Sequence, residues 1–108
     1  MITRKELLTM NNYPGKEVGE VLGYVKGSTV QTKNVGKDIL AGFKSLIGGE
    51  ISSYTDMMNE ARQIATERLL KDAEELGADA VLGFRLQTSA VMGGAAEIIA
   101  YGTAVKFK

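Results

Sequence analysis

Acidic side chains near the end of a long predicted helix are the first residues in this chain whose type and spacing suggest chemistry. Asp72, Glu75 and Asp79 fall close together in the sequence. Carboxylate oxygens are the ligands that hard cations such as Ca²⁺ and Mg²⁺ prefer, so these three residues are candidate metal ligands. Surface carboxylates on a helix are also ordinary, and a solvated helix face is the alternative interpretation.

A second candidate lies just before the same helix, where two glycines are followed by two serines. Free backbone N–H groups at a helix start, together with serine hydroxyls, can hold an anion. The segment lacks the Lys-Ser/Thr pair of a phosphate-binding Walker loop and the strand context of a dinucleotide site. A plain connector between two helices is therefore the alternative. The candidate ligand-binding residues are Gly48, Gly49, Ser52 and Ser53.

The residue inventory excludes several classes of function. The chain has no Cys and no His, which removes thiolate chemistry, disulfides and the commonest general base near neutral pH. Thirteen basic and thirteen acidic residues give a formal net charge of zero, which disfavours nucleic-acid binding. No apolar run approaches the ~20 residues of a membrane span and no secretory signal is visible, so we expect a cytoplasmic protein without membrane contact.

The many Ser and Thr residues have no His or Cys to activate them as nucleophiles. A matched nucleophile and base is the usual signature of an active site, and none stands out. We therefore expect a protein that is not an enzyme, and the sequence identifies no cofactor.

A long amphipathic helix is predicted for residues 53–76, and the other elements are arranged to cover it. Ser53 is a favourable N-cap, and Gly77 is a natural residue to end the helix. The helix would contain ~23 residues and span ~35 Å at 1.5 Å per residue. Its apolar face repeats at steps of three and four residues and comprises Tyr54, Met58, Ala61, Ala65, Leu69, Ala73 and Leu76.

Three strands and a shorter helix are predicted around the long helix. Alternation of side chains predicts strands at residues 17–30, 80–87 and 96–107, and residues 35–47 have one apolar helical face. The order strand, helix, helix, strand, strand predicts one α+β domain over residues 1–108. We expect an antiparallel sheet of about three main strands packed against one long and one shorter helix. In the second strand, one face is expected to meet the long helix. The two predicted faces are Ala80, Leu82, Phe84 and Leu86, and Val81, Gly83, Arg85 and Gln87.

The remaining connections are predicted from turn residues. Pro14-Gly15 favours a tight turn, and Gly93-Gly94 between two alternating runs favours a hairpin. Leu7 and Leu8 are expected in a short edge strand.

One layer of helix covers only one face of such a sheet, so apolar side chains are left on the other face. Val21, Val25 and either Ile98 or Ile99 are expected there. Uncovered strands and edges favour a partner chain, and self-association into a closed oligomer is the simplest solution. Strand faces made of small residues allow another chain to approach closely. The residues predicted at that interface are Gly19, Gly23, Gly27, Ala100, Gly102 and Ala104.

Five segments spread along the chain carry a family resemblance. They are Gly15 before the first strand, Gly48-Gly49 followed by Tyr54, Ala61-Arg62, the run Leu76-Gly77-Ala78-Asp79-Ala80-Val81 with Gly83, and the closing Tyr101-Gly102-Thr103-Ala104-Val105-Lys106. In combination they resemble the YbjQ family, small bacterial and archaeal proteins of unestablished function that are often labelled "putative heavy-metal-binding". The resemblance implies a subunit of the dodecin-like fold class, assembled as a homo-pentamer, and it supplies no catalytic residues. Soft and borderline metals prefer Cys and His ligands, and this chain has neither.

The residues and the resemblance together predict a non-enzymatic, pentameric module that binds a small ligand or ion. Binding is expected at subunit boundaries or along the axis of the oligomer. Two alternatives stay open. One is a carboxylate-based, metal-dependent enzyme that uses the acids of residues 72–79, and the other is a structural scaffold without a ligand.

Overall fold

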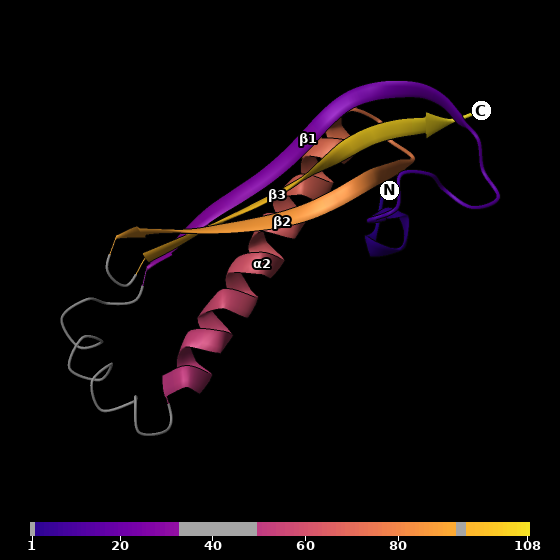
Figure 1. Cartoon of the computed structure of the whole chain (residues 1–108). Coiled ribbons are helices and arrows are strands. Elements are labelled where there is room, and N and C mark those ends of the chain that lie inside the picture. The colour runs from indigo at the N-terminus through magenta and orange to yellow at the C-terminus, as the bar shows by residue number, and fades with distance from the viewer. Residues whose placement is uncertain (1, 33–49, 93–94) are drawn as a thin grey trace.

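The computed structural model describes residues 2–32, 50–92 and 95–108, and it has the predicted α+β class (Figure 1). A three-stranded antiparallel sheet in the order β1-β3-β2 carries a long helix across one face. The predicted shorter helix at residues 35–47 lies outside the described residues. The elements are the 3₁₀ helix η1 (Arg4–Glu6), β1 (Val18–Thr32), α2 (Glu50–Glu75), β2 (Ala80–Met92) and β3 (Ala95–Phe107).

Helix α2 begins earlier than predicted and ends where predicted. It starts at Glu50, so Ser53 is an internal helical residue and the N-cap assignment was wrong. An acidic residue in the first turn is favourable beside the positive end of the helix dipole, which is consistent with the earlier start. At the other end Gly77 has φ +75°, and the amide of Ala78 donates to the carbonyl of Ala73 at 3.1 Å. This left-handed glycine ends the helix as the sequence indicated.

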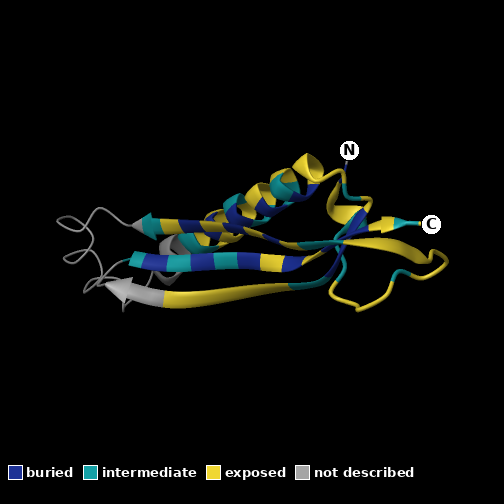
Figure 2. Ribbon diagram, turned by 90° about the horizontal axis from the view of Figure 1, so that it is seen from above, coloured by how far each residue is buried: buried dark blue, intermediate teal, exposed yellow. Residues whose placement is uncertain are grey.

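The main core lies between α2 and the sheet. One stripe of α2 is fully buried, and it consists of Ala61, Ala65, Leu69 and Ala73. Opposite it, alternate residues of β3 are buried from Ala96 to Ala104 (Figure 2). Three of the four helix residues are alanines, so the helix axis can approach the sheet closely. The sheet residues in this core include Val25, Val81, Ile98, Ala100 and Ala104.

The face prediction for β2 was wrong at its first residues. The pairing register of β2 with β3 shifts between Leu82 and Arg85, and Gly83 has φ +63°. Such a bulge turns the following side chains to the opposite face. Ala80 and Leu82 therefore pack away from α2, while Phe84 packs on the helix side.

The N-terminal segment, residues 2–17, wraps around the edge of β2. The amide of Leu8 donates to the carbonyl of Val81, and the amide of Phe84 donates to the carbonyl of Leu8, both at 2.9 Å. The predicted edge strand is reduced to a single parallel bridge between Leu7 and Val81. Tyr13 then packs edge-to-face on Phe107 with ring centroids 4.9 Å apart, so this segment covers one end of the sheet's second face.

Two turns agree with their predictions. Gly15 has φ +81°, and the amide of Lys16 donates to the carbonyl of Tyr13, which closes a tight turn. Strands β2 and β3 are antiparallel, with Met92 paired to Ala95 across the predicted hairpin. In the described part of the chain, no helix is long and apolar enough to cross a membrane.

Candidate functional site: the open face of the sheet

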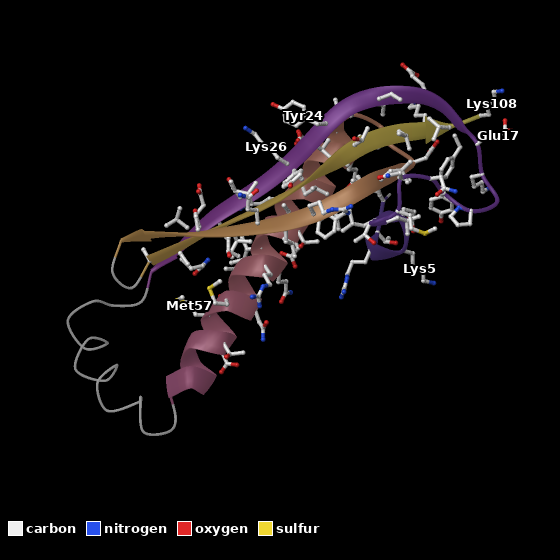
Figure 3. The ribbon with its side chains drawn as sticks, in the orientation of Figure 1. Lys5, Glu17, Tyr24, Lys26, Met57 and Lys108 are labelled. Atoms are coloured by element: carbon white, nitrogen blue, oxygen red, sulfur yellow. The ribbon has the colours of Figure 1, made fainter. Side chains whose placement is uncertain are left out.

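In the part of the chain that the structure describes, the sheet face turned away from α2 is largely uncovered, and we call it the open face. Side chains of paired strands that lie opposite each other share a face, so the register defines its members. Tyr24, Lys26, Ser28 and Val30 come from β1, Glu97, Ile99, Tyr101 and Thr103 from β3, and Arg85, Gln87 and Ser89 from β2. Figure 3 shows Tyr24 and Lys26 projecting outward from β1.

The open face presents large apolar and aromatic side chains to solvent. Tyr24 is 74% exposed, Val21 64% and Tyr101 40%. The prediction of apolar residues on the uncovered face is confirmed for Val21 and is wrong for Val25, which is fully buried beneath α2. Of the two alternatives Ile98 and Ile99, Ile99 lies on the open face and Ile98 is fully buried. Exposed aromatic side chains grouped on one face are typical of a binding surface.

Charge on the open face is divided between two positions along β3. Lys26 and Arg85 stand on either side of Tyr101, whereas Glu97 lies four residues further along the strand. At about 3.4 Å per residue, the basic and acidic positions are ~14 Å apart. Arg85 is held in place because its guanidinium donates to the carbonyls of Thr9 and Phe84 at 3.0 and 2.8 Å.

A pocket of about 220 Å³ opens on this face where the N-terminal segment meets the sheet. Its walls are mostly aliphatic, and two polar side chains, Asn11 and Thr103, stand among them. No charged side chain among the described residues lines it, so the pocket suits a small uncharged molecule with an apolar body and a hydrogen-bonding group. Its lining residues are Asn11, Val18, Val21, Leu82, Gly83, Thr103 and Val105.

The acidic residues proposed as metal ligands do not converge. The carboxylate of Asp72 accepts a hydrogen bond from the amide of Lys26 in β1 at 3.2 Å. The carboxylate of Asp79 accepts one from the amide of Phe107 in β3 at 2.8 Å, and Glu75 is exposed at the end of α2. Among the described residues, no group of three Asp or Glu side chains is placed to hold a metal ion. Two of these acids thus connect the helix and its following turn to the strands.

The described residues do not show the predicted anion-binding loop before the helix. Ser52 and Ser53 lie inside the first turn of α2, and Gly48 and Gly49 lie outside the described residues. The binding role of these four residues stays a prediction.

Four of the six small residues predicted at an interface between chains lie on the helix side of the sheet. Gly27, Ala100, Gly102 and Ala104 are buried there, and the main chain of α2 sits directly on Gly27. Gly19 and Gly23 lie toward the other end of β1. Gly23 has φ +122° at a register shift, with nothing within 4 Å of an added Cβ. Close approach at Gly27 is therefore made within the chain, and contacts of the six residues with another chain stay a prediction.

The pocket was not predicted from the sequence, because it depends on the N-terminal segment folding over the sheet. The apolar residues Leu8 and Tyr13 are the signal that could have suggested this, since both pack against the cluster around Val105. Short mixed segments give no periodicity, so their partner cannot be assigned before the sheet is known.

The fold and the open face define a small α+β protein with one uncovered sheet face, and comparisons with known proteins identify its family. A YbjQ family model described as "Putative heavy-metal-binding" matches residues 6–108. The UPF0145 protein of Alkaliphilus metalliredigens is 58% identical over 101 residues, covering 94% of this chain and 98% of that protein. A UPF0145 protein of Halalkalibacterium halodurans is 61% identical over 100 residues, covering 93% and 94%. The chain therefore belongs to the YbjQ family, as its motifs indicated.

A solved structure shares the fold. It is the crystal structure of a protein of unknown function from Pediococcus pentosaceus, a member of the DUF74 family. The TM-score is 0.59 at 18% sequence identity, with 94% of this chain and 96% of that chain covered. At this level of identity the likeness concerns the fold alone.

The donor chemistry of this chain does not fit the heavy metal in the family's description. Soft and borderline metals bind thiolate and imidazole groups, and the chain contains no Cys and no His. Near the end of α2, the carboxylates of Asp72 and Asp79 each accept a hydrogen bond from a main-chain amide, and the two amides belong to different strands. No step of the function proposed below is therefore assigned to a metal.

Proposed function

We propose that the protein is a non-enzymatic homo-oligomeric module that binds a small uncharged ligand at its open face. The observation that carries the proposal is the exposure of Tyr24, Val21 and Tyr101 on one continuous sheet face. A stable monomer gains nothing from this exposure, whereas a second copy that covers these side chains removes apolar area from water at about 25 cal/mol per Å². The dodecin-like class and the five-subunit assembly that the resemblance implies are parts of this proposal.

A second copy of the same chain suits the open face because of its charges. Lys26 and Arg85 form a basic region, and Glu97 is the acidic residue on the same face. Two copies can therefore place unlike charges opposite each other without any further component. The pocket beside Val21 then lies at a boundary between subunits, where small-molecule sites are common.

Native mass spectrometry of the purified protein tests the proposal, because it reads subunit number and bound mass together. A pentamer that carries a defined extra mass below a few hundred daltons supports both parts, and a bare oligomer supports the scaffold alternative. A monomer at micromolar concentration contradicts the proposal.

A variant pair connects the assembly to the open face. Tyr24→Glu places a charge at the most exposed aromatic position and is expected to shift the oligomer toward smaller species. Gln63→Glu adds the same charge on the exposed side of α2 and serves as the control. Equal subunit numbers for the two variants would show that the open face is not the contact surface.

A further inference from the structure

One stretch of the sheet edge has no partner within the described residues. Strand β2 is an edge strand, and its residues from Arg85 to Ser89 are exposed on both faces (Figure 2). The helix packs mainly over β1 and β3 and hardly reaches β2. Leu86, which points to the helix side, is consequently 41% exposed.

The hydrogen-bond pattern shows which main-chain groups point outward from this edge. The amide of Lys26 donates to Asp72 of α2, so the pair Lys26–Tyr101 is not hydrogen-bonded between β1 and β3. In an antiparallel ladder Tyr101 must then bond to its other neighbour, Arg85 of β2. Alternation along β2 therefore directs the N–H and C=O groups of Leu86, Thr88 and Ala90 away from the sheet.

Two other stretches of the sheet edges are occupied. On β1, Asp72 takes the amide of Lys26, and the guanidinium of Arg68 donates to the carbonyl of Ser28 at 2.6 Å. On β2, the N-terminal segment occupies the edge as far as Phe84. Side-chain and backbone contacts of this kind protect edges from pairing, and none is present from Leu86 to Ala90 in the described part of the chain.

We propose that the edge of β2 from Leu86 to Ala90 is the surface through which a second copy of this chain extends the sheet. Unpaired N–H and C=O groups at alternate residues over ~14 Å select an extended strand as the partner. The segment Leu86-Gln87-Thr88-Ser89-Ala90 contains no charge, so a copy of the chain meets no like-charge repulsion there. The inference rests on the proposed homo-oligomer and names a contact surface within it.

Replacing a residue whose main-chain N–H points outward from the edge of β2 tests the proposed pairing with a second copy. Thr88→Pro removes an N–H that makes no bond within its own sheet, and proline is tolerated at such edge positions. Thr88→Ala is the matched control, because it keeps the amide and removes only the side chain. We expect native mass spectrometry to show the wild-type subunit number for Thr88→Ala and monomers for Thr88→Pro, with the far-ultraviolet circular dichroism of both unchanged.

Hydrogen–deuterium exchange of the wild-type protein provides a measurement that needs no variant. If the edge is paired, the Thr88 amide exchanges slowly, on the order of a hundredfold below the rate of an unprotected amide, as expected for a local opening that costs a few kcal/mol. The Gln87 amide points into the sheet and is protected in either case, so it serves as the internal reference.

The outcomes separate this inference from the proposed function. A wild-type oligomer that persists in Thr88→Pro, or a rapidly exchanging Thr88 amide within an oligomer, overturns the edge pairing and leaves the homo-oligomer standing. A monomeric wild-type protein overturns both. An even number of subunits indicates pairing of two identical edges, whereas five subunits indicate a ring in which β2 meets a different segment of the next copy.

Discussion

Gly27 is the position where one added methyl group tests the packing of α2 on β1. A Cβ built on Gly27 overlaps the main-chain oxygen of Ala65 and the main-chain nitrogen of Leu69. It also lies 2.8 Å from the carbonyl carbon of Arg68, well below the ~3.5 Å of a favourable carbon contact. Because all three are main-chain atoms, rotation of a side chain cannot relieve the overlap.

The expected cost of Gly27→Ala is about 3 kcal/mol of unfolding free energy. Relief requires α2 to retreat by roughly 1 Å, and overpacking of this kind costs about 1–3 kcal/mol. The upper value applies because the retreat also loosens Ala65 and Leu69, both of which are fully buried. At about 4 °C or more per kcal/mol for a domain of this size, the Tm should fall by about 12 °C or more.

The assay is urea and thermal unfolding of the wild type, Gly27→Ala and Ser28→Ala. All three are compared at one protein concentration, because association makes the Tm concentration-dependent. Ser28→Ala is the matched control, since this neighbouring side chain is exposed and its main-chain bond to Arg68 is kept. If the two variants unfold within about 0.5 kcal/mol of each other, the close packing of α2 on β1 is refuted.

Three further predictions follow from the same packing and from the ligand inventory. Leu69→Ala should cost about 2–5 kcal/mol in urea unfolding because Leu69 is fully buried, while Glu67→Ala on the exposed side of α2 should stay within about 0.5 kcal/mol. Asp72→Ala should cost about 1 kcal/mol because the amide of Lys26 loses its acceptor, and Asp72→Asn, which keeps an acceptor oxygen, should recover most of it. Titration of the wild type with Zn²⁺ in a calorimeter should give no saturable heat at micromolar metal, and a saturable isotherm would contradict the donor-chemistry argument.

The buried stripe of the helix could be predicted from the sequence because it depends on local periodicity. Ala61, Ala65, Leu69 and Ala73 repeat at four-residue steps, and each is fully buried. Alternation along β3 separated its two faces correctly, but the buried face was not assigned, because Ala100 and Ala104, which are buried in the core with α2, were predicted at an interface between chains. The periodic pattern holds in α2 and β3 because neither element contains a bulge that turns the following side chains to the opposite face.

Strands β1 and β2 show where local reasoning fails. Each contains register shifts, and Gly23 and Gly83 adopt positive φ at or beside one of them. A glycine in a strand indicates that a bulge is possible, but not that the phase of the following side chains changes there. Leu82 was consequently placed on the same face as Phe84, although the two pack on opposite sides of the sheet, and Val25 was placed on the uncovered face although it is fully buried. The pocket was missed for a related reason, because the segment that completes it has no periodicity.

Four of the six small strand residues that were predicted to let another chain approach closely lie on the helix side of the sheet. Glycine and alanine at positions such as Gly27 and Ala100 let α2 lie close to β1 and β3. The close approach that these small residues allow is therefore made within the chain. The same placement draws the helix away from β2, which leaves Leu86 half-exposed and, among the described residues, the edge at Thr88 without cover. A side chain larger than glycine at position 27 would hold the helix further from the sheet. The packing that stabilises the chain therefore also determines which edge of the sheet the helix leaves exposed.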